Sequence, residues 1–393
     1  MPRTLIVTND FPPRQGGIET FVHAMAARFP PDRVAVYTSS SPGDRSYDAG
    51  LPFPVVRDRT HMLLPTPRVT ARAARLAQEL DCDSVWFGAA APLGLMAGEL
   101  RRRTAVERLV ATTHGHEVWW ARTPGARALL HRIGAQTDSV TYLGSYTRQR
   151  IASAIGPKSA ARMSRLAPGV DPDVFRCSGE GAARVRDRYR LGTAPVVLCA
   201  ARLIPRKGQD TLIHALRLVR QSVPDAVLLL VGTGPYEGAL RRLAAKQGLT
   251  GSVIFAGGHP HEEMPDFYAA AQVFAMPCRT RRAGMEVEGL GIVFLEAAAA
   301  GLPVVVGESG GAPDAVQDGE SGFVVDGNEP RGVADRLTAL LSDAESASRM
   351  GAKGREWVRR EWGWDTAYSR LAELLKVTGE CAVTSGPEGS RLP

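Results

Sequence analysis

Short apolar runs alternate with helical stretches in the first 168 residues. The apolar runs, which predict buried strands, lie at residues 4–8, 33–37, 84–87, 109–113 and 139–142. The stretches with helical periodicity lie between them, at residues 18–28, 69–80 and 145–154. Such alternation is typical of βαβ units, whose parallel strands place ligands at their carboxyl ends.

A second series follows segment 168–172, which is rich in proline and glycine as a linker would be. We therefore predict an α/β protein with two Rossmann-like domains, residues 1–168 and 169–360. Residues 345–377 have a helical pattern, and the tail at 379–393 is expected to be disordered. The strands predicted in the second series lie at residues 196–200, 226–231, 253–256, 273–276 and 304–306, and the helices at 210–221, 236–247 and 292–300.

One stretch combines a glycine loop, a helix and a buried strand. Gly291 precedes the helix at 292–300, and the first N–H groups of a helix lack intrahelical partners, so loop and helix start form a ready anion site. Glu288 lies in the loop, and Glu296 lies about one turn into the helix. One carboxylate would hold a sugar and the other a ribose, or both are solvated surface groups.

Length and composition agree with two domains. A chain of 393 residues is long for a single core, and 44% hydrophobic with 23% charged residues is an ordinary globular composition. No apolar run approaches the ~20 residues of a membrane span, and the first residues form a strand pattern, so we expect a cytoplasmic protein. The five scattered cysteines indicate neither a disulfide framework nor a zinc site.

Positive charge is concentrated in one segment. The net charge is +7, and residues 101–162 hold eleven Arg and Lys against three acids, which favours an anionic partner. Aromatic residues do not alternate with these cations as in nucleic-acid sites, so an anionic membrane is favoured over nucleic acid. Segment 124–134 is a short basic amphipathic helix with Arg127 and Arg132 off its apolar face. It either lies on a membrane or packs on its own domain.

Several candidate residues follow predicted strands directly. Arg202 and Lys207 put two cations at the carboxyl end of a strand, which is either an anion site or a basic surface turn. Gly16 and Gly17 offer backbone N–H groups, or form only a tight turn. His114 also follows a strand, although a lone histidine is usually structural.

The motifs together carry a family resemblance. Glu288 and Glu296 form an E-x7-E pair, and TNDFPPRQGGI at 8–18, THGHEVW at 113–119 and ARLIPRKGQ at 201–209 occur in the expected order. The chain resembles the retaining glycosyltransferases of the GT-B fold. With residues 64–67 and 85–92, it most resembles the actinobacterial phosphatidylinositol mannosyltransferases that use GDP-mannose.

The resemblance implies a GT-B architecture, in which two Rossmann-like domains face a central crevice and a final helix at 361–378 crosses back to the first domain. It implies metal-independent transfer of α-mannose from GDP-mannose to phosphatidylinositol monomannoside, an anionic glycolipid, in α-1,6 linkage and with retention. The protein would be peripheral on the inner face of the membrane, docking through its first domain. No cofactor beyond the donor substrate is expected.

The resemblance also implies residue roles. Glu288 would contact the transferred sugar, Glu296 the ribose, and His114 the reacting sugar. The catalytic residues would be His114, Glu288, Arg202 and Lys207. The donor-binding residues would be Gly16, Gly17, Arg202, Lys207, Glu288, Gly291, Ile292, Val293 and Glu296. For the acceptor, position at the strand ends of the first domain suggests Asp10, Arg14, His116 and Trp119.

Some short patterns resemble motifs of metal or dinucleotide sites. They are D-x-D at residues 81–83 and 171–173, H-x-H at 114–116 and 259–261, and a glycine-rich pattern at 232–238. None has the position or spacing of a metal or dinucleotide site, so we expect no metal, and a nicotinamide oxidoreductase is disfavoured. A non-catalytic nucleotide-binding module and a glycosyltransferase with another donor or a soluble acceptor remain open. The motifs do not indicate whether the base of the nucleotide-sugar donor is guanine or uracil.

Overall fold

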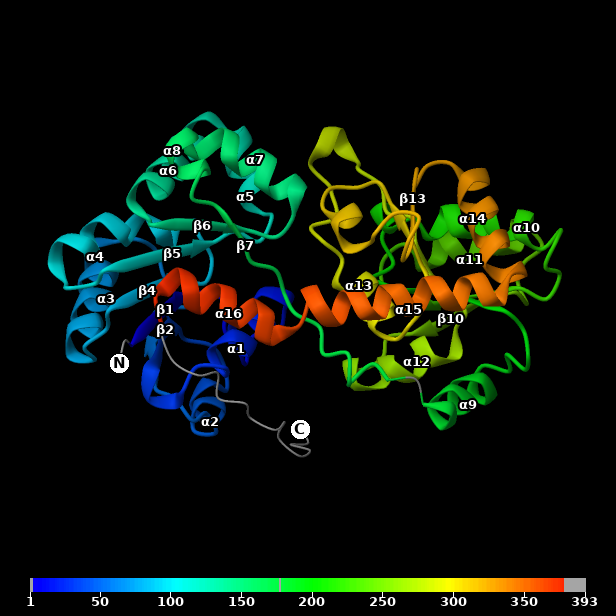
Figure 1. The fold of residues 1–393 in the computed structure, drawn as a ribbon, viewed down its shortest axis with the longest axis horizontal. Helices are drawn as coiled ribbons and strands as arrows, with labels where there is room; N and C mark the ends of the chain where they lie inside the picture. Colours follow the sequence, from blue (N-terminus) through cyan, green and yellow to red (C-terminus); the bar gives the residue numbers. More distant parts are fainter. Residues whose placement is uncertain (1–2, 177, 378–393) are drawn as a thin grey trace. The chain divides into compact units, whose positions relative to one another are not determined.

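The computed structural model describes residues 3–176 and 178–377, and it has two compact units (Figure 1). The first unit comprises the described part of Met1–Gly169 with that of Trp364–Pro393, and the second comprises that of Val170–Gly363. The predicted tail at 379–393 lies outside the described residues. Each unit is built on one parallel sheet.

The first sheet has seven parallel strands in the order β3-β2-β1-β4-β5-β6-β7. This order results because the chain starts at the centre, moves outward to β3 and then returns past β1 to build the other half. Every pairing is parallel, as the alternation of strands and helices predicts. Its strands are β1 (Thr4–Thr8), β2 (Val34–Ser39), β3 (Val55–Asp58), β4 (Ser84–Phe87), β5 (Arg108–Thr112), β6 (Ser139–Tyr142) and β7 (Ser164–Arg165).

Helices cover both faces of this sheet, because successive strand residues point to opposite sides. Leu5 and Val7 pack in one core with α3, α4, α6 and α7, whereas Ile6 packs in the other with α1 and α16 (Figure 1). The helices are α1 (Gly17–Ala26), α2 (Asp44–Asp48), α3 (Pro67–Glu79), α4 (Ala97–Arg103), α5 (Glu117–Arg122), α6 (Pro124–Gln136), α7 (Ser145–Ile155), α8 (Pro157–Ala160) and α16 (Trp364–Leu375).

The second sheet has six parallel strands in the order β10-β9-β8-β11-β12-β13. Its strands are β8 (Val196–Ala200), β9 (Val227–Val231), β10 (Val253–Gly257), β11 (Val273–Met276), β12 (Val304–Gly307) and β13 (Gly322–Val325). Its helices are α9 (Gly179–Arg188), α10 (Gln209–Val219), α11 (Glu237–Lys246), α12 (Met264–Ala270), α13 (Ile292–Ala299), α14 (Pro330–Ser342) and α15 (Ala344–Glu361).

The last helix returns to the first unit. Tyr368 of α16 packs edge-on against Phe29 at 5.0 Å between ring centroids, and Leu371 is fully buried in the same core. Gly169 makes room for the entry of this helix, because a Cβ there would lie 2.5 Å from the Trp364 Cα. The returning helix begins at Trp364 rather than at residue 361, and the chain reaches this point directly from α15.

The sequence patterns missed some elements and joined others. The single helical pattern at 345–377 is two helices, α15 and α16, because the chain leaves helical geometry at Trp362, before Gly363. Strands β3, β7 and β13 were not predicted. β7 has only two residues, Ser164 and Arg165, and these lack the apolar character by which strands are recognised.

Candidate active site

Glu288 of the second unit is held by two cations from the turn after β8. Its Oε2 lies 2.7 Å from Lys207 Nζ and 2.8 Å from an Arg206 guanidinium nitrogen. Arg206 also donates to the Val287 carbonyl at 3.0 Å. Since Glu288 is only 7% exposed, this carboxylate is a buried, paired group and not a solvated surface one.

Glycines allow the Glu288 loop to pack closely. Gly291 has φ of 80° and starts α13, a conformation that favours glycine. A Cβ on Gly310 or Gly311 would lie 2.1 Å from the carbonyl oxygens of Glu288 and Gly289, respectively. The turn after β12 therefore needs both glycines to support the loop. Its Gly311 N–H donates to the Glu288 carbonyl at 2.9 Å.

The second glutamate of the pair lies inside α13. Tyr268 donates its hydroxyl proton to Glu296 Oε2 at 2.8 Å, and His261 Nε2 lies 2.9 Å from Oε1. Burial raises the pKa of Glu296, and burial followed by the nearby carboxylate raises the pKa of Tyr268 well above its usual value. Tyr268 is fully buried, whereas the His261 side chain is 62% exposed. The carboxylate thus has one fixed oxygen and one oxygen that faces a displaceable partner.

The start of α13 offers backbone donors between the two glutamates. Gly291 makes no side-chain cap, and Ile292 and Val293 are the first two helical residues. Their N–H groups precede the first intrahelical hydrogen bonds, so they remain available to an anion. An electropositive site thus surrounds Glu288, formed by the start of α13 together with Lys207 and Arg206.

Arg202 does not join this cluster. It is exposed, and its backbone carbonyl accepts a hydrogen bond from the Gln209 side chain at 3.1 Å. Among the described residues, the cations that contact Glu288 are Lys207 and Arg206. Arg206 was not predicted, because the sequence of this basic turn does not indicate which arginine faces the glutamate.

In the first unit, His114 and Glu117 form a compact pair after β5. The His114 backbone N–H donates to Glu117 Oε2 at 3.0 Å, and its ring Nε2 lies 2.6 Å from the Gly88 carbonyl oxygen. Because a carbonyl only accepts, Nε2 carries the proton, and Nδ1 is the ring atom left as an acceptor. Burial lowers the pKa of His114, so the ring is neutral near pH 7.

Acidic groups gather around Asp10 at the end of β1. Burial raises the pKa of Asp10, and the carboxylates of Glu19 and Glu117 raise it further, against His116 and Arg14. Glu117 is fully buried, and no donor in the described ranges hydrogen-bonds its Oε1, which lies 3.2 Å from His116 Nε2. Glu117 was missed in the sequence, where it looks like an ordinary helix-start carboxylate.

The other predicted residues of the first unit lie near these strand ends. Gly16 and Gly17 are exposed at the start of α1. Arg14 donates to the carbonyls of Asn9 and His61, which ties it to the loop that follows β3. Trp119 lies on α5 with 59% of its surface exposed.

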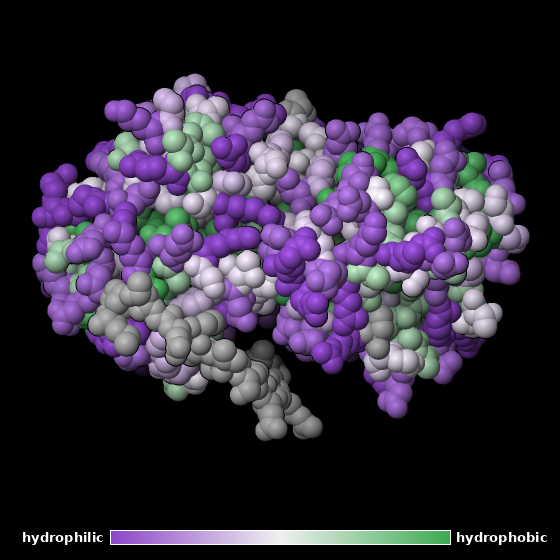
Figure 2. Space-filling view, viewed as in Figure 1, coloured by the Kyte–Doolittle hydropathy of each residue, from purple (hydrophilic) through white to green (hydrophobic). Residues whose placement is uncertain are grey.

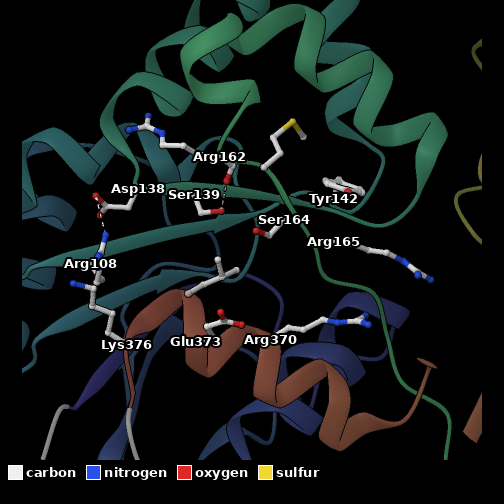
Figure 3. Close-up of a pocket in the computed structure, with 12 residues that line it drawn as sticks. Arg108, Asp138, Ser139, Tyr142, Arg162, Ser164, Arg165, Arg370, Glu373 and Lys376 are labelled. Atoms are coloured by element: carbon white, nitrogen blue, oxygen red, sulfur yellow. Dashed lines mark hydrogen bonds and ion pairs between the residues drawn. The ribbon is translucent and has the colours of Figure 1, made fainter. Parts of the chain in front are cut away.

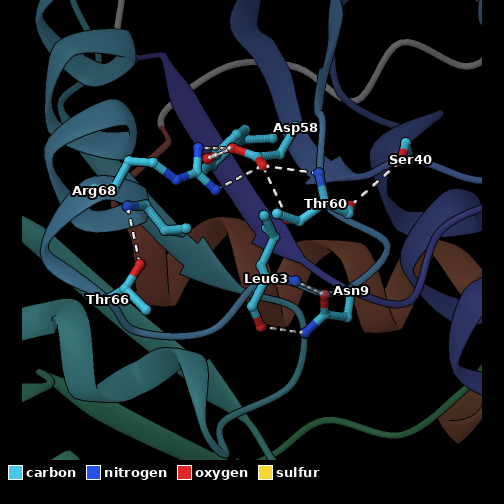
Figure 4. A network of polar contacts seen from close by, with 9 residues as sticks. Asn9, Ser40, Asp58, Thr60, Leu63, Thr66 and Arg68 are labelled. Carbon is cyan, nitrogen blue, oxygen red and sulfur yellow. Dashed lines mark hydrogen bonds and ion pairs between the residues drawn. The ribbon is translucent and has the colours of Figure 1, made fainter.

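Two polar networks hold that loop, residues 59–66, against the sheet (Figure 4). Asn9 donates to the Leu63 carbonyl at 3.0 Å and accepts from the Leu63 N–H at 2.6 Å. Asp58 accepts two hydrogen bonds from Arg68, at 2.9 and 3.0 Å, and two from Thr60. Anchored in this way, the loop exposes the apolar side chains next to Leu63, those of Met62 and Leu64, at 60% and 48%.

The predicted amphipathic helix is α6, and its apolar face is used internally. Leu130 and Ile133 are fully buried in the core of the first unit. Arg127 donates to the backbone carbonyls of Ala121 and Ser153, so it is a structural residue. The helix therefore packs on its own domain, as one of the two alternatives predicted, and Leu129 and Arg132 are among its exposed residues.

Known proteins resemble the chain in fold and in sequence. The models "Glycosyltransferase Family 4" and "Glycosyl transferases group 1" match residues 15–174 and 184–357. The crystal structure of HepE from Anabaena in complex with UDP is similar with a TM-score of 0.79 and 20% identity, covering 96% of this chain and 100% of that one. The fold is GT-B, and the class is that of the glycosyltransferases.

Two curated relatives narrow this class. The GDP-mannose-dependent alpha-(1-6)-phosphatidylinositol monomannoside mannosyltransferase of Mycobacterium tuberculosis is 50% identical over 382 residues, 96% of this chain and 98% of the relative. The GDP-mannose-dependent monoacylated alpha-(1-6)-phosphatidylinositol monomannoside mannosyltransferase of Corynebacterium glutamicum is 43% identical over 95% of this chain and 98% of the relative. The chain belongs to the family of these mannosyltransferases, which confirms the resemblance.

Proposed function

We propose that this chain transfers α-mannose from GDP-mannose to phosphatidylinositol monomannoside, with retention and in α-(1→6) linkage. One observation carries the proposal: a buried Glu288, paired with Lys207, lies in front of a helix start in a chain 50% identical to an enzyme of that name. An electropositive site of this kind suits a sugar diphosphate.

The donor would bind along the α13 loop. Its diphosphate would accept hydrogen bonds from the N–H groups of Ile292 and Val293 and from the ammonium group of Lys207. Further candidates for binding the diphosphate are Gly16, Gly17 and Arg202. The ribose hydroxyls would bind Glu296 in place of His261. Glu288 would turn to the mannose, whose positive charge in the transition state it would stabilise.

The transfer would proceed on one face of the sugar. The acceptor hydroxyl attacks the anomeric carbon while the bond from that carbon to the β-phosphate oxygen breaks. The hydroxyl proton passes to the departing diphosphate, and GDP leaves. His114 would stand near the sugar through its Nδ1 or its carbonyl, and the step would require no metal ion.

The acceptor would bind in the first unit. Asp10 would accept hydrogen bonds from its hydroxyls, and Arg14 and His116 would face its phosphate. Trp119 would pack on the acceptor or on the surface of the bilayer.

The protein would be peripheral on an anionic membrane. None of the helices in the described ranges combines the length and apolar character of a membrane span. On the face that Figure 2 shows, hydrophilic residues predominate and apolar ones are scattered. Met62 and Leu64 follow β3 and Trp119 follows β5, so all three lie near the edge of the sheet where its parallel strands end. We infer that these three exposed side chains, with Arg132, touch the bilayer.

A donor and product assay tests the proposal. Calorimetric titration should show that GDP binds and that UDP binds far more weakly. With GDP-mannose and phosphatidylinositol monomannoside, nuclear magnetic resonance of the product should show an α-(1→6) mannosyl linkage. Preference for UDP, or transfer only to a soluble acceptor, would favour a related glycosyltransferase of the same fold.

A further inference from the structure

A basic groove of about 660 Å³ lies in the first unit, between α16 and the edge strand β7. Residues from β5, β6, β7 and α16 line it (Figure 3). The proposed roles of donor and acceptor residues do not involve this groove. Its cationic residues are Arg108, Arg162, Arg165, Arg370 and Lys376, and its acidic ones are Asp138 and Glu373.

The groove exists because α16 covers only part of the sheet. The helix packs on β4 and β5, whereas β6 and the two-residue β7 extend beyond it. A parallel strand covered on both faces carries apolar residues almost continuously. Here Ser139 and Ser164 line the groove instead. Polar residues on this part of the sheet fit a surface in contact with water or a polar ligand.

The two acidic residues of the groove do not both neutralise its cations, because Asp138 pairs mainly with a residue outside it. Asp138 already binds Arg101, from outside the groove, at 2.6 Å, and it also accepts the Leu109 N–H at 2.8 Å. Arg108 lies farther from it, at 3.9 Å. The lining residues thus include five cations and two acids, and one of these acids, Asp138, is mainly compensated by Arg101 from outside the groove.

Arg162 is held in place by neutral groups. Its guanidinium lies 3.4 Å from the carbonyl oxygens of Gly134 and Thr137, which are neutral acceptors. Its own carbonyl accepts the Ser139 hydroxyl proton at 2.8 Å, a bond drawn in Figure 3. These contacts orient the residue, but carbonyls do not compensate a full positive charge as a carboxylate would.

We propose that this groove is an anion site for a polyol phosphate, separate from the donor and acceptor sites. Arginine forks bind phosphate oxygens in pairs, serine hydroxyls complement a polyol, and the volume lies within the usual range for small-ligand sites. The acceptor candidates Asp10 and Arg14 come directly after β1, a strand inside the sheet. The groove instead lies along β7, the strand at one edge of the sheet. The ligand is either a free inositol phosphate or the head group of an inositol phospholipid.

Amide hydrogen exchange locates the binding. The full chain is saturated with GDP, so that the donor site is filled, and myo-inositol 1-phosphate is added as the probe. We expect slower exchange in β6, β7 and α16 as well as at any acceptor contacts. Unchanged exchange in these three elements would overturn the proposal.

A matched pair of variants tests the charge. Arg162→Ala/Lys376→Ala removes two cations from the groove, and Arg75→Ala/Lys158→Ala removes an exposed arginine and lysine elsewhere in the first unit. The groove variant should weaken the probe-dependent protection of β7 and α16 by about tenfold or more in probe concentration, and the control variant should not. Exchange in β1 and β4 without the probe, equal to that of the native chain, shows that the first unit of the groove variant is folded. Equal protection in all three proteins would refute the proposal.

Vesicles distinguish the two sources of ligand. If the groove binds a lipid head group, phosphatidylcholine vesicles with added phosphatidylinositol should protect β7 and α16 in the native chain and not in the groove variant. If only soluble myo-inositol 1-phosphate does so, the ligand is a free polyol phosphate. If neither protects the groove, the proposal is wrong.

Discussion

Lys207 Nζ lies 2.7 Å from Glu288 Oε2, and the glutamate is 7% exposed. Each group compensates the charge of the other. The diphosphate of a bound donor would pair with Lys207 in place of Glu288, and Glu288 would then contact the sugar.

The first prediction separates the cations of this site. Lys207→Ala should weaken GDP binding by about 1.5–3 kcal/mol, the usual value of a hydrogen bond to a charged group, and turnover should fall. Calorimetric titration of GDP measures the affinity. Arg202→Ala is the companion variant, because Arg202 is exposed and does not contact Glu288. An equal loss in both variants would show that Arg202 swings in when the donor binds, and no loss in either would contradict the diphosphate assignment.

The second prediction concerns the two glutamates. Glu296→Ala should lose GDP affinity, because the ribose is present in GDP and in GDP-mannose alike. Glu288→Gln should leave GDP binding nearly intact and lower kcat, since its contact is to the sugar and is strongest in the transition state. Calorimetry and steady-state kinetics distinguish the two profiles. Identical profiles would contradict the division of roles.

The third prediction assigns Tyr268 as a positioning residue for Glu296. Tyr268→Phe removes the 2.8 Å hydrogen bond and leaves the ring in place. The carboxylate then loses its fixed partner, and GDP affinity should fall several-fold while kcat at saturating donor changes less. Tyr189→Phe, another tyrosine of the second unit, serves as the control. If KM for GDP-mannose stays unchanged in Tyr268→Phe, the residue only fills the core.

Much of this site could be predicted because the chemistry is local in sequence. The glycine, helix and strand pattern around Gly291 predicted the loop, and Glu288, Glu296 and Lys207 occupy motif positions. The structure confirms the GT-B fold and brings Lys207 to Glu288. It also adds Arg206, which local sequence could not distinguish from Arg202.

The residues that were missed depend on long-range packing. In the sequence, Tyr268 looks like an apolar core residue. Its hydroxyl has a carboxylate partner because α12 approaches α13, which brings it to Glu296. Glu117 is buried because the strands around it place it beside His114. The break between α15 and α16 falls at Trp362 and Gly363, and a continuous helical pattern in the sequence does not indicate it.

The fourth prediction tests membrane contact. Met62→Ser/Leu64→Ser should reduce sedimentation with phosphatidylinositol-containing vesicles at low salt, because a fully buried side chain of this size contributes about 1.5–3 kcal/mol and partial insertion contributes less. Val174→Ser/Met285→Ser is the matched control, since these side chains are also exposed, at 52% and 70%, but lie in the second unit. GDP affinity should be unchanged in both variants.

Salt provides a second test of the same contact. Arg132→Glu should weaken the binding further, and high salt should release the native chain, because attraction between Arg or Lys and an anionic surface acts within about one Debye length, ~8–10 Å. Equal binding to neutral vesicles, or equal loss in both serine variants, would contradict docking through loop 59–66.

The last prediction concerns acid stability and the Asp58 network. Hydrogen bonds from Arg68, and then from Tyr37 and Thr60, hold the pKa of this buried carboxyl well below its usual range despite desolvation. A carboxyl with a depressed pKa stabilises the fold above its unfolded-state pKa of about 4, and that contribution is lost as pH falls toward the folded-state value. Arg68→Met should therefore lower the unfolding free energy at pH 7. The loss should be smaller than for a fully buried pair, because Arg68 is 44% exposed.

The pH dependence gives this prediction its control. Below about pH 4 the native chain should lose stability as Asp58 takes up a proton, and the difference between native and Arg68→Met chains should shrink. Arg176→Met breaks an ion pair with Asp173 whose two side chains are about 70% exposed, so it should cost little at either pH. Urea unfolding at pH 7 and pH 3.5 measures both differences. A constant difference for Arg68→Met across this range would mean that packing of the arginine stem, and not its charge on Asp58, stabilises the loop.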